Sequence, residues 1–187
     1  SLCVLGPYTP RTSISGSNFS GTGDVLVMVR DSAIIEDCRF GSVLSVAEYL
    51  WMTGSGIRVT GCEFGPTEVP IHAAIQTGIS LGYHFENNVF HDLEVSGAVV
   101  NFSAPAGATS SFINNTFRNT RGAVAFASGG GLSLQRQGDE LPTIWVSQCT
   151  FDSCFAYTPT GFGSMDLGVS SVTIEDNTFT GHGPLAP

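Results

Sequence analysis

A six-residue pattern recurs seven times along the chain and constrains the fold more than any other feature. It reads apolar, any, any, Asn or Cys or Ser, any, Phe. Successive motif Phe residues lie 21, 24, 26, 27, 34 and 28 residues apart, at Phe19, Phe40, Phe64, Phe90, Phe117, Phe151 and Phe179. A core pattern repeated every 20 to 50 residues or so is typical of a solenoid, in which each repeat stacks on the next.

Each copy of the motif reads as a strand, a two-residue bend and a second strand. In the last copy, Val172 and Ile174 alternate with polar residues, which indicates a short half-buried strand. Asp176 is a residue type that tolerates the left-handed backbone angles of a bend. Asn177 is then expected to point inward at the corner, and Phe179 to face the core. A third strand per repeat is expected within residues 25–29, 43–46, 73–75, 97–100 and 122–126.

Stacking of such repeats places like residues over like. The motif Phe residues are therefore expected to form one buried aromatic column. The polar motif position is expected to form an inward corner ladder of Ser17, Cys38, Cys62, Asn88, Asn115, Cys149 and Asn177. Buried amides are tolerated only with hydrogen-bond partners, and a ladder supplies them.

The pattern predicts an all-β, right-handed, single-stranded parallel β-helix solenoid of about seven rungs with three short strands each. An antiparallel sandwich would favour Asn-Gly or Asp-Gly hairpins, and the chain has neither. We expect residues 1–187 to form a single β-helix domain that is a segment of a longer solenoid, because neither end reads as a polar cap.

Charge and hydrophobicity restrict the partners. The net charge is −9, there is no Lys, and all seven cationic residues are Arg. Because nucleic-acid binding depends on cations that neutralise phosphates, we expect no nucleic-acid partner. No run approaches the roughly 18 apolar residues of a membrane helix, so we expect no membrane insertion.

Residue types that bind metals are present but not clustered in sequence. The five Cys residues, Cys3, Cys38, Cys62, Cys149 and Cys154, contain no Cys-x-x-Cys pair, so a zinc site is not indicated. Cys38 and Cys62 occupy the same position in adjacent repeats and are interpreted either as buried free thiols or as a disulfide. His84 and His91 flank the fourth motif on expected outward positions, as surface histidines or as a metal pair.

Two sets of motifs resemble known families. The segments 87–90, 114–117 and 176–179 (Asn-Asn-Val-Phe, Asn-Asn-Thr-Phe and Asp-Asn-Thr-Phe) resemble the strand–Asn–strand corner of the pectate-lyase-like superfamily. The segments 149–156 and 115–124 resemble repeats of polymorphic outer-membrane proteins and related large surface proteins. Three residues after the Phe, however, this chain never has the Asn of those repeats. The resemblance implies the β-helix fold and an extracellular or cell-surface location.

Enzymes with this fold cleave polysaccharides on one outer face, which is what the resemblance implies for activity. They use paired carboxylates, or calcium-binding Asp residues with an Arg or Lys base. This chain has no Asp-Asp pair and no Arg-x-Pro-x-x-Arg segment. Gly181-His182-Gly183 resembles the His-Gly step of polygalacturonases but lacks the acidic pair one rung earlier. We therefore assign no catalytic residue, no metal site and no cofactor.

Two segments are candidates for binding. Residues 129–142 form the longest insertion and are expected to project as a loop, in which Arg136, Asp139 and Glu140 are candidates for contact with a ligand, calcium or a partner. The alternative is a solvated excursion. Trp51, with Tyr49 and Met52, is interpreted either as loop packing or as a platform on which a sugar stacks.

Three Asn-x-Ser/Thr sequons, at Asn18, Asn101 and Asn114, are candidates for glycosylation. The leading hypothesis is a structural or adhesive segment of a large extracellular or cell-surface protein, acting as a rigid scaffold and display surface. The first alternative is a carbohydrate-active enzyme of lyase or hydrolase type, or a non-catalytic sugar-binding segment. The second is a filament or tail-spike subunit whose partners are other segments or subunits stacked end to end.

Overall fold

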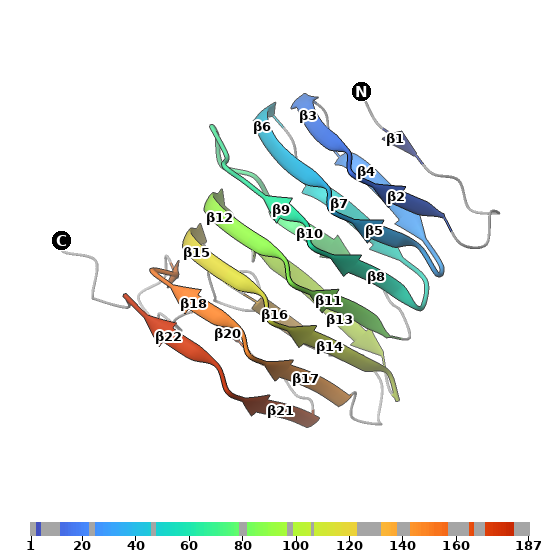
Figure 1. Ribbon diagram of the computed structural model, residues 1–187, viewed down its shortest axis with the longest axis vertical. Coiled ribbons are helices and arrows are strands. Elements are labelled where there is room, and N and C mark those ends of the chain that lie inside the picture. Colours follow the sequence, from blue (N-terminus) through green and yellow to red (C-terminus); the bar gives the residue numbers. More distant parts are fainter. Residues whose placement is uncertain are drawn as a thin grey trace.

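A computed structural model describes residues 3–4, 12–22, 25–45, 48–78, 82–96, 99–105, 107–122, 132–137, 143–156, 165–166 and 171–181. These residues form an all-β parallel solenoid with three sheets, in which every strand pair among the described residues is parallel. Figure 1 shows the strands as a stack that runs from the N-terminus to the C-terminus. The prediction of a parallel solenoid is confirmed.

Sheet A contains the strand that precedes each motif. In order across the sheet its strands are β1 (Cys3–Val4), β4 (Val25–Arg30), β7 (Glu48–Thr53), β10 (Ala73–Thr77), β13 (Val100–Pro105), β16 (Leu132–Gln137) and β20 (Met165–Asp166).

Sheet B contains the first strand of each motif. Its order is β2 (Ser13–Ser15), β5 (Ile34–Glu36), β8 (Ile57–Thr60), β11 (Tyr83–Glu86), β14 (Thr109–Ile113), β17 (Thr143–Ser147) and β21 (Ser171–Glu175). The register places the first apolar residue of each motif over its equivalent, as in Ile35 over Val59 and Phe112 over Val146.

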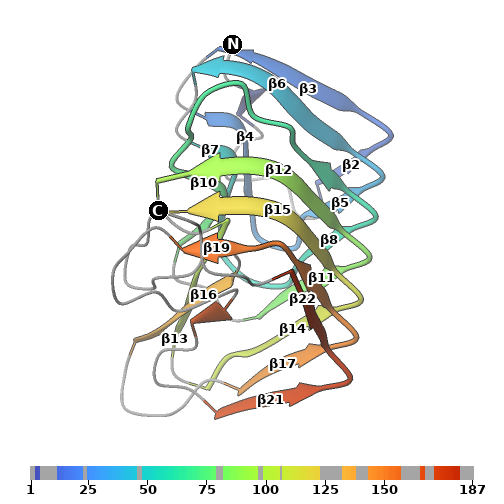
Figure 2. The same cartoon turned by 90° about the vertical axis from the view of Figure 1, so that its left-hand side faces the viewer.

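Sheet C contains the strand that begins at each motif Phe. Its order is β3 (Asn18–Thr22), β6 (Arg39–Ser45), β9 (Glu63–Phe64), β12 (Val89–Val95), β15 (Thr116–Gly122), β18 (Thr150–Asp152) and β22 (Thr178–Thr180), with β19 (Phe155–Ala156) also paired to β15. The solenoid has about four turns, traced by β4 through β15, so the prediction of about seven rungs is wrong, because the outermost motif copies add strands to the ends of each sheet rather than further full turns (Figures 1 and 2).

The bend between sheets B and C has a left-handed backbone in every motif. The φ angles lie between +51° and +65° at Gly16, Asp37, Gly61, Asn87, Asn114, Gln148 and Asp176. Gly, Asn and Asp tolerate this region best, which explains the composition of the bend. The bend N–H donates to a carbonyl of the next turn, as from Asp37 to Thr60 (3.0 Å) and from Asn87 to Ile113 (3.1 Å).

The seven motif Phe rings stack in one column inside the solenoid. Neighbouring ring centroids are 4.7–4.9 Å apart, and the rings are within 16° of parallel. The five central rings are buried, Phe19 is partly buried, and Phe179 is 48% exposed. Phe85 and Phe112 stack in the same way beneath sheet B, with centroids 4.7 Å apart.

The corner ladder runs beside the Phe column, and its Asn side chains clamp each turn to the one before it. Asn88 accepts from the Cys62 N–H (2.9 Å) and donates to the Val59 carbonyl (2.8 Å). Asn115 repeats this arrangement one turn later, accepting from the Asn88 N–H (3.0 Å) and donating to the Phe85 carbonyl (3.0 Å). These bonds satisfy amides that are almost completely buried.

The three Cys residues of the ladder, and Cys154 outside it, are free thiols. Cys38, Cys62, Cys149 and Cys154 are all buried and unbridged, so the disulfide interpretation of Cys38 and Cys62 is wrong in this structure. Each thiol is positioned to donate to a carbonyl, as Cys38 does to Glu36 at 3.2 Å. Burial, the largest influence, raises the pKa of the Cys62 thiol to about 12.

The third strands were located only in part by sequence. Residues 25–29 and 73–75 lie in β4 and β10 as expected, and β13 begins at Val100. Residues 43–45 instead extend β6, and the sheet A strand of that turn is β7. Residues 123–126 lie outside the described part of the chain, and β16 supplies the sheet A strand there. Apolar content alone could not show whether an apolar stretch continues a long sheet C strand or forms the sheet A strand that follows it.

Candidate functional site

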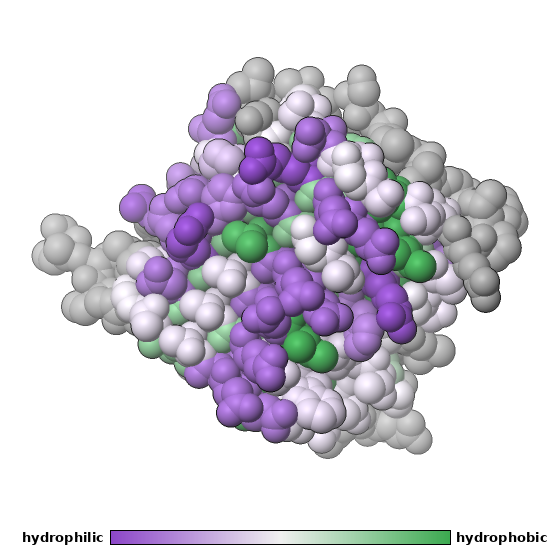
Figure 3. Space-filling view, in the orientation of Figure 1, coloured by the Kyte–Doolittle hydropathy of each residue, from purple (hydrophilic) through white to green (hydrophobic). Residues whose placement is uncertain are grey.

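The outer face of sheet C carries the most connected set of polar side chains that the structure describes. Because the motif Phe residues point inward, the residues before and after each Phe point outward. The residue before the Phe gives the row Asn18, Arg39, Glu63, and the residue after it gives Ser20, Gly41, Gly65 and His91. Hydrophilic side chains dominate the face formed by sheets B and C (Figure 3).

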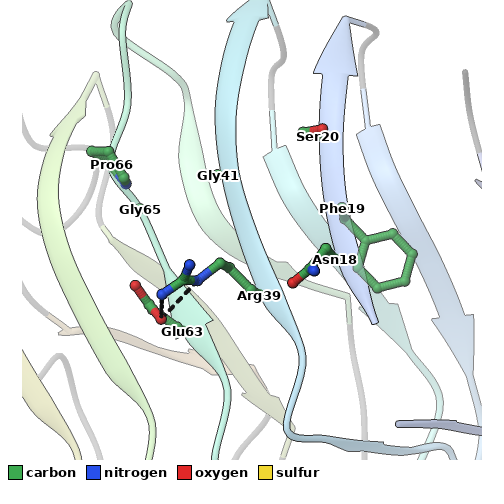
Figure 4. Close-up of a pocket in the computed structure, with 8 residues that line it drawn as sticks. All are labelled: Asn18, Phe19, Ser20, Arg39, Gly41, Glu63, Gly65 and Pro66. Atoms are coloured by element: carbon green, nitrogen blue, oxygen red, sulfur yellow. Dashed lines mark hydrogen bonds and ion pairs between the residues drawn. The ribbon is translucent and has the colours of Figure 1, made fainter. Parts of the chain in front are cut away.

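Two glycines hollow this face. A Cβ on Gly41 would lie 2.6 Å from the Gly65 carbonyl oxygen, and a Cβ on Gly65 would overlap the His91 carbonyl oxygen. Gly65 also has φ +122°, which favours glycine. The result is a surface cavity of about 420 Å³ lined by Asn18, Phe19, Ser20, Arg39, Gly41, Glu63, Gly65 and Pro66 (Figure 4).

A chain of charged hydrogen bonds runs along one side of this cavity. Arg39 donates to Glu63 Oε2 from Nη2 (2.6 Å) and Nε (2.9 Å), and the two side chains point toward one another across β6 and β9 (Figure 4). His91 Nε2 contacts Glu63 Oε1 at 2.9 Å, and His91 Nδ1 contacts Asp92 Oδ2 at 2.8 Å. Asn119 donates to Asp92 Oδ1 at 2.6 Å. The chain therefore joins four neighbouring strands, β6, β9, β12 and β15.

The two carboxyl groups in this series of hydrogen bonds, those of Glu63 and Asp92, both have a lowered pKa. For Glu63, burial raises the pKa, but hydrogen bonds from Arg39 and His91 outweigh it and the net shift is downward. For Asp92, hydrogen bonds from His91 and then Asn119 lower the pKa. A hydrolase acid must hold its proton near neutral pH, which needs a raised pKa. Neither Glu63 nor Asp92 meets that requirement.

The cavity offers fixed donors and acceptors rather than a reactive pair. Arg39 has a 62% exposed side chain that is held by Glu63, and the Asn18 and Ser20 side chains lie on the opposite side. Such a set suits a neutral ligand rich in hydroxyl groups, each of which can both donate and accept. Among the described residues no group of three or more His, Cys, Asp or Glu side chains is placed to hold a metal ion.

The apolar residues around Trp51 lie in strand β7, not in a loop. Tyr49 and Met52 are buried, and the Tyr49 hydroxyl donates to the Pro66 carbonyl at 3.2 Å. Trp51 is partly buried, with an indole nitrogen that is enclosed and has no hydrogen-bond partner. Packing therefore accounts for Tyr49 and Met52.

The insertion at 129–142 is only partly described. Its middle, Leu132–Gln137, forms β16 and pairs with β13 and β20, so this part belongs to sheet A. Arg136 lies on this strand opposite Ala104. Asp139 and Glu140 lie outside the described residues.

The two histidines are on different sheets. His84 is in β11 of sheet B, where its Nδ1 contacts the Ser111 hydroxyl. His91 is in β12 of sheet C and belongs to the charged chain. Gly181 is the last described residue of the Gly-His-Gly segment, and His182 lies beyond it.

The three sequon Asn residues differ in exposure. Asn18 is exposed beside the sheet C cavity, and Asn114 is exposed at a bend, where it donates to Asn87 at 2.7 Å. Asn101 is 6% exposed and donates to Gln76 at 2.8 Å.

Sequence reasoning did not identify Arg39, Glu63, Asp92 or Asn119 as site residues. Their position in the repeat could have identified Arg39 and Glu63. Each directly precedes a motif Phe, the two repeats are adjacent, and the two side chains are of opposite charge. Asp92 and Asn119 lie two residues after a motif Phe, where the backbone turns left-handed at φ +51° and +50°.

No protein-family model, no curated protein and no solved structure matches this chain. Within the described residues, no helix has the length and apolar character needed to cross a membrane.

Proposed function

We propose that this chain is a structural or adhesive segment of a large extracellular or cell-surface protein, built as a right-handed β-helix. One observation carries the proposal. The inward Phe column and corner ladder repeat like over like, whereas the outward positions of the same strands carry unlike polar residues. A uniform interior with a varied exterior suits a rigid scaffold that displays a surface.

The interior supports the scaffold role. Each turn contacts mainly its neighbours, so stability in such a stack sums over turn-to-turn contacts and the rod can extend without a new core. The Asn88 and Asn115 clamps and the parallel ladders fix each turn on the one before it. The net charge of −9 favours solubility of the exposed faces.

For the adhesive role, we assign the contact with cells or matrix to the outer face of sheet C. Beads coated with the protein would be retained on cells or matrix from its source. The double variant Arg39→Ala/Glu63→Ala removes both charges of the cavity and is expected to reduce retention several-fold. Arg58→Ala/Glu36→Ala makes the same change of charge at exposed sheet B positions and is the matched control.

Location is tested separately on intact source cells. An antibody against the chain is expected to label unpermeabilised cells, and external protease is expected to remove that label. Labelling only after permeabilisation would contradict the extracellular assignment. Equal bead retention by both double variants would contradict the role of the sheet C face while leaving the scaffold role standing.

Sugar binding without catalysis is the second candidate, favoured by the cavity beside Arg39 and Glu63. The side chains that line the cavity include both hydrogen-bond donors and acceptors, which a hydroxyl-rich sugar ring can pair with. The glycine backbone at its base leaves room for such a ring. A glycan array with the Arg39→Ala variant as control tests it. Release of new reducing ends from a bound polysaccharide would instead favour the enzyme interpretation.

A further inference from the structure

The outer face of sheet B carries an arginine whose guanidinium has no partner among the described residues. Arg58 in β8 is exposed and lies in register beside His84 of β11, which lies in register beside Ser111 of β14. Figure 1 shows these three strands on successive turns. The guanidinium of Arg39 is bound to Glu63, whereas that of Arg58 forms no ion pair or side-chain hydrogen bond in the described part of the chain. It is therefore available to a ligand.

A hollow lies beside this arginine. It has a volume of about 240 Å³ and is lined by Gly56, Ile57, Arg58, Gly82, Tyr83, His84 and Thr109. Gly56 and Gly82 directly precede β8 and β11 and carry no side chain, which leaves the hollow open. Gly82 has φ +93°, and a Cβ there would lie 2.8 Å from the Thr109 carbonyl oxygen, so this position requires glycine.

The polar groups around the hollow are hydrogen-bond donors from three successive turns. His84 Nδ1 contacts the hydroxyl of Ser111, which is 8% exposed. When that hydroxyl donates to Nδ1, the ring hydrogen is on Nε2, which has no partner among the described residues. The exposed Thr109 adds a hydroxyl on β14. The hollow is thus lined by the Arg58 guanidinium, an imidazole N–H and a hydroxyl.

Two carboxylates lie near the hollow without occupying its donors. Glu86 is two residues along β11 from His84. Glu36 and Glu86 both lie in register beside Thr60, which is two residues along β8 from Arg58. Neither forms an ion pair with Arg58 in the described structure. Their negative charge opposes an anion in the hollow, so removing one of them should strengthen anion binding.

We propose that this hollow binds a tetrahedral oxyanion, which is a sulfate or phosphate group. Arginine binds such groups through parallel N–H bonds that match their oxygens. A carboxylate has two oxygens in one plane, and one guanidinium can satisfy both. Donors that reach the hollow from three turns instead suit an anion whose oxygens point in several directions.

The proposal rests on sheet B alone and is independent of the adhesive role given to sheet C. Bead retention is compared in excess inorganic sulfate, which fills the sheet B site of the native chain. Arg58→Ala/Glu36→Ala then remains a matched control for the sheet C variant. Failure of either proposal leaves the other standing.

Calorimetric titration with sodium sulfate and sodium phosphate at constant ionic strength tests the site. The native chain is expected to bind one equivalent of anion, and acetate is expected not to bind. Arg58→Gln should weaken binding at least tenfold. Arg118→Gln removes the same charge from an exposed position on sheet C and should bind as the native chain does. Glu86→Gln should strengthen binding several-fold, an effect that loss of structure would not produce.

A second titration shows whether the anion is accepted free or as part of a larger molecule. The probes are dextran sulfate and uncharged dextran of the same length. Binding of dextran sulfate that is lost in Arg58→Gln would show that the site accepts a sulfate ester. Binding of inorganic sulfate without binding of dextran sulfate would restrict the site to the free ion. Both results support the site, and they distinguish its two sources of ligand.

Two results would overturn the proposal. The first is the absence of one-equivalent binding of both sulfate and phosphate to the native chain. The second is an equal loss of binding in Arg58→Gln and Arg118→Gln, which would show that the anion responds to net charge rather than to the hollow. Circular dichroism establishes that each variant is folded.

Discussion

The inside of the solenoid and the outer face of sheet C use the same stacked strands in opposite ways. Inside, identical groups lie over one another, as Phe64, Phe90 and Phe117 do at centroid distances of 4.7–4.8 Å. Outside, Arg39 lies over Glu63, so neighbouring turns are joined by unlike groups. Apolar rings gain from stacking on their own kind, whereas charges gain only from their opposites. A one-dimensional stack can therefore repeat its interior without repeating its surface.

The largest difference between the two regions is expected from removing one ring of the column. Phe90→Ala leaves a cavity between two stacked rings and should lower the free energy of unfolding by about 3–5 kcal/mol. Val89→Ala, on the outward side of the same strand, should cost far less. Chemical denaturation measures both, and equal losses would remove the distinction between inside and outside.

A ladder amide is expected to have the next largest effect. Asn115→Leu removes the acceptor for the Asn88 N–H and the donor to the Phe85 carbonyl, leaving buried groups unpaired. The expected loss is about 1–3 kcal/mol of unfolding free energy. The exposed Asn18 on β3 is the control position, and Asn18→Leu should change stability little. A larger loss for Asn18→Leu would show that the ladder has been misassigned.

The bends should respond to backbone angle rather than to side-chain contacts. Asp37 has φ +52°, and the equivalent residues one turn before and after it are Gly16 and Gly61. Asp37→Ala should therefore be less stable than Asp37→Gly by about 1 kcal/mol, because a Cβ is disfavoured there. Thermal unfolding compares the pair, and a more stable Ala variant would contradict the left-handed bend.

The charged chain of sheet C should have the smallest effect and the clearest pH dependence. The folded pKa values of Glu63 and Asp92 are lowered, so their stabilisation is present above their unfolded values, about 4.3 and 3.9, and is lost as pH falls through the folded values. Glu63→Gln should flatten this acid limb and cost roughly 0.2–1 kcal/mol at neutral pH. Unfolding curves from pH 7 to pH 2 measure it, and an unchanged acid limb would show that the ion pairs contribute nothing.

Much of the fold could be predicted because one motif determines strand, bend and inward residue together. The spacing from Ile35 to Cys38 to Phe40 specifies two strands and the corner between them, and repetition supplies the register. The sheet A strands were harder to place. They lie in stretches of variable length, and the sequence of β16 resembles a polar insertion more than a strand.

The candidate site was largely out of reach of sequence reasoning for a physical reason. Arg39, Glu63 and His91 are 24 and 28 residues apart along the chain and meet only when the register of sheet C is known. The hollow beside them depends on Gly41 and Gly65 lying on adjacent turns, which the motif does not specify. Sequence reasoning instead selected Trp51, whose strand places it on sheet A.

The central claim, that each turn stacks in register on the next, is tested most directly by contacts between Phe rings. Nuclear Overhauser spectra of protein labelled only at Phe should show each motif ring contacting the preceding and following motif rings, as Phe90 contacts Phe64 and Phe117. Single-Phe replacements by Leu assign the signals. Contacts between Phe64 and Phe117, without Phe90 between them, would contradict the stacked solenoid.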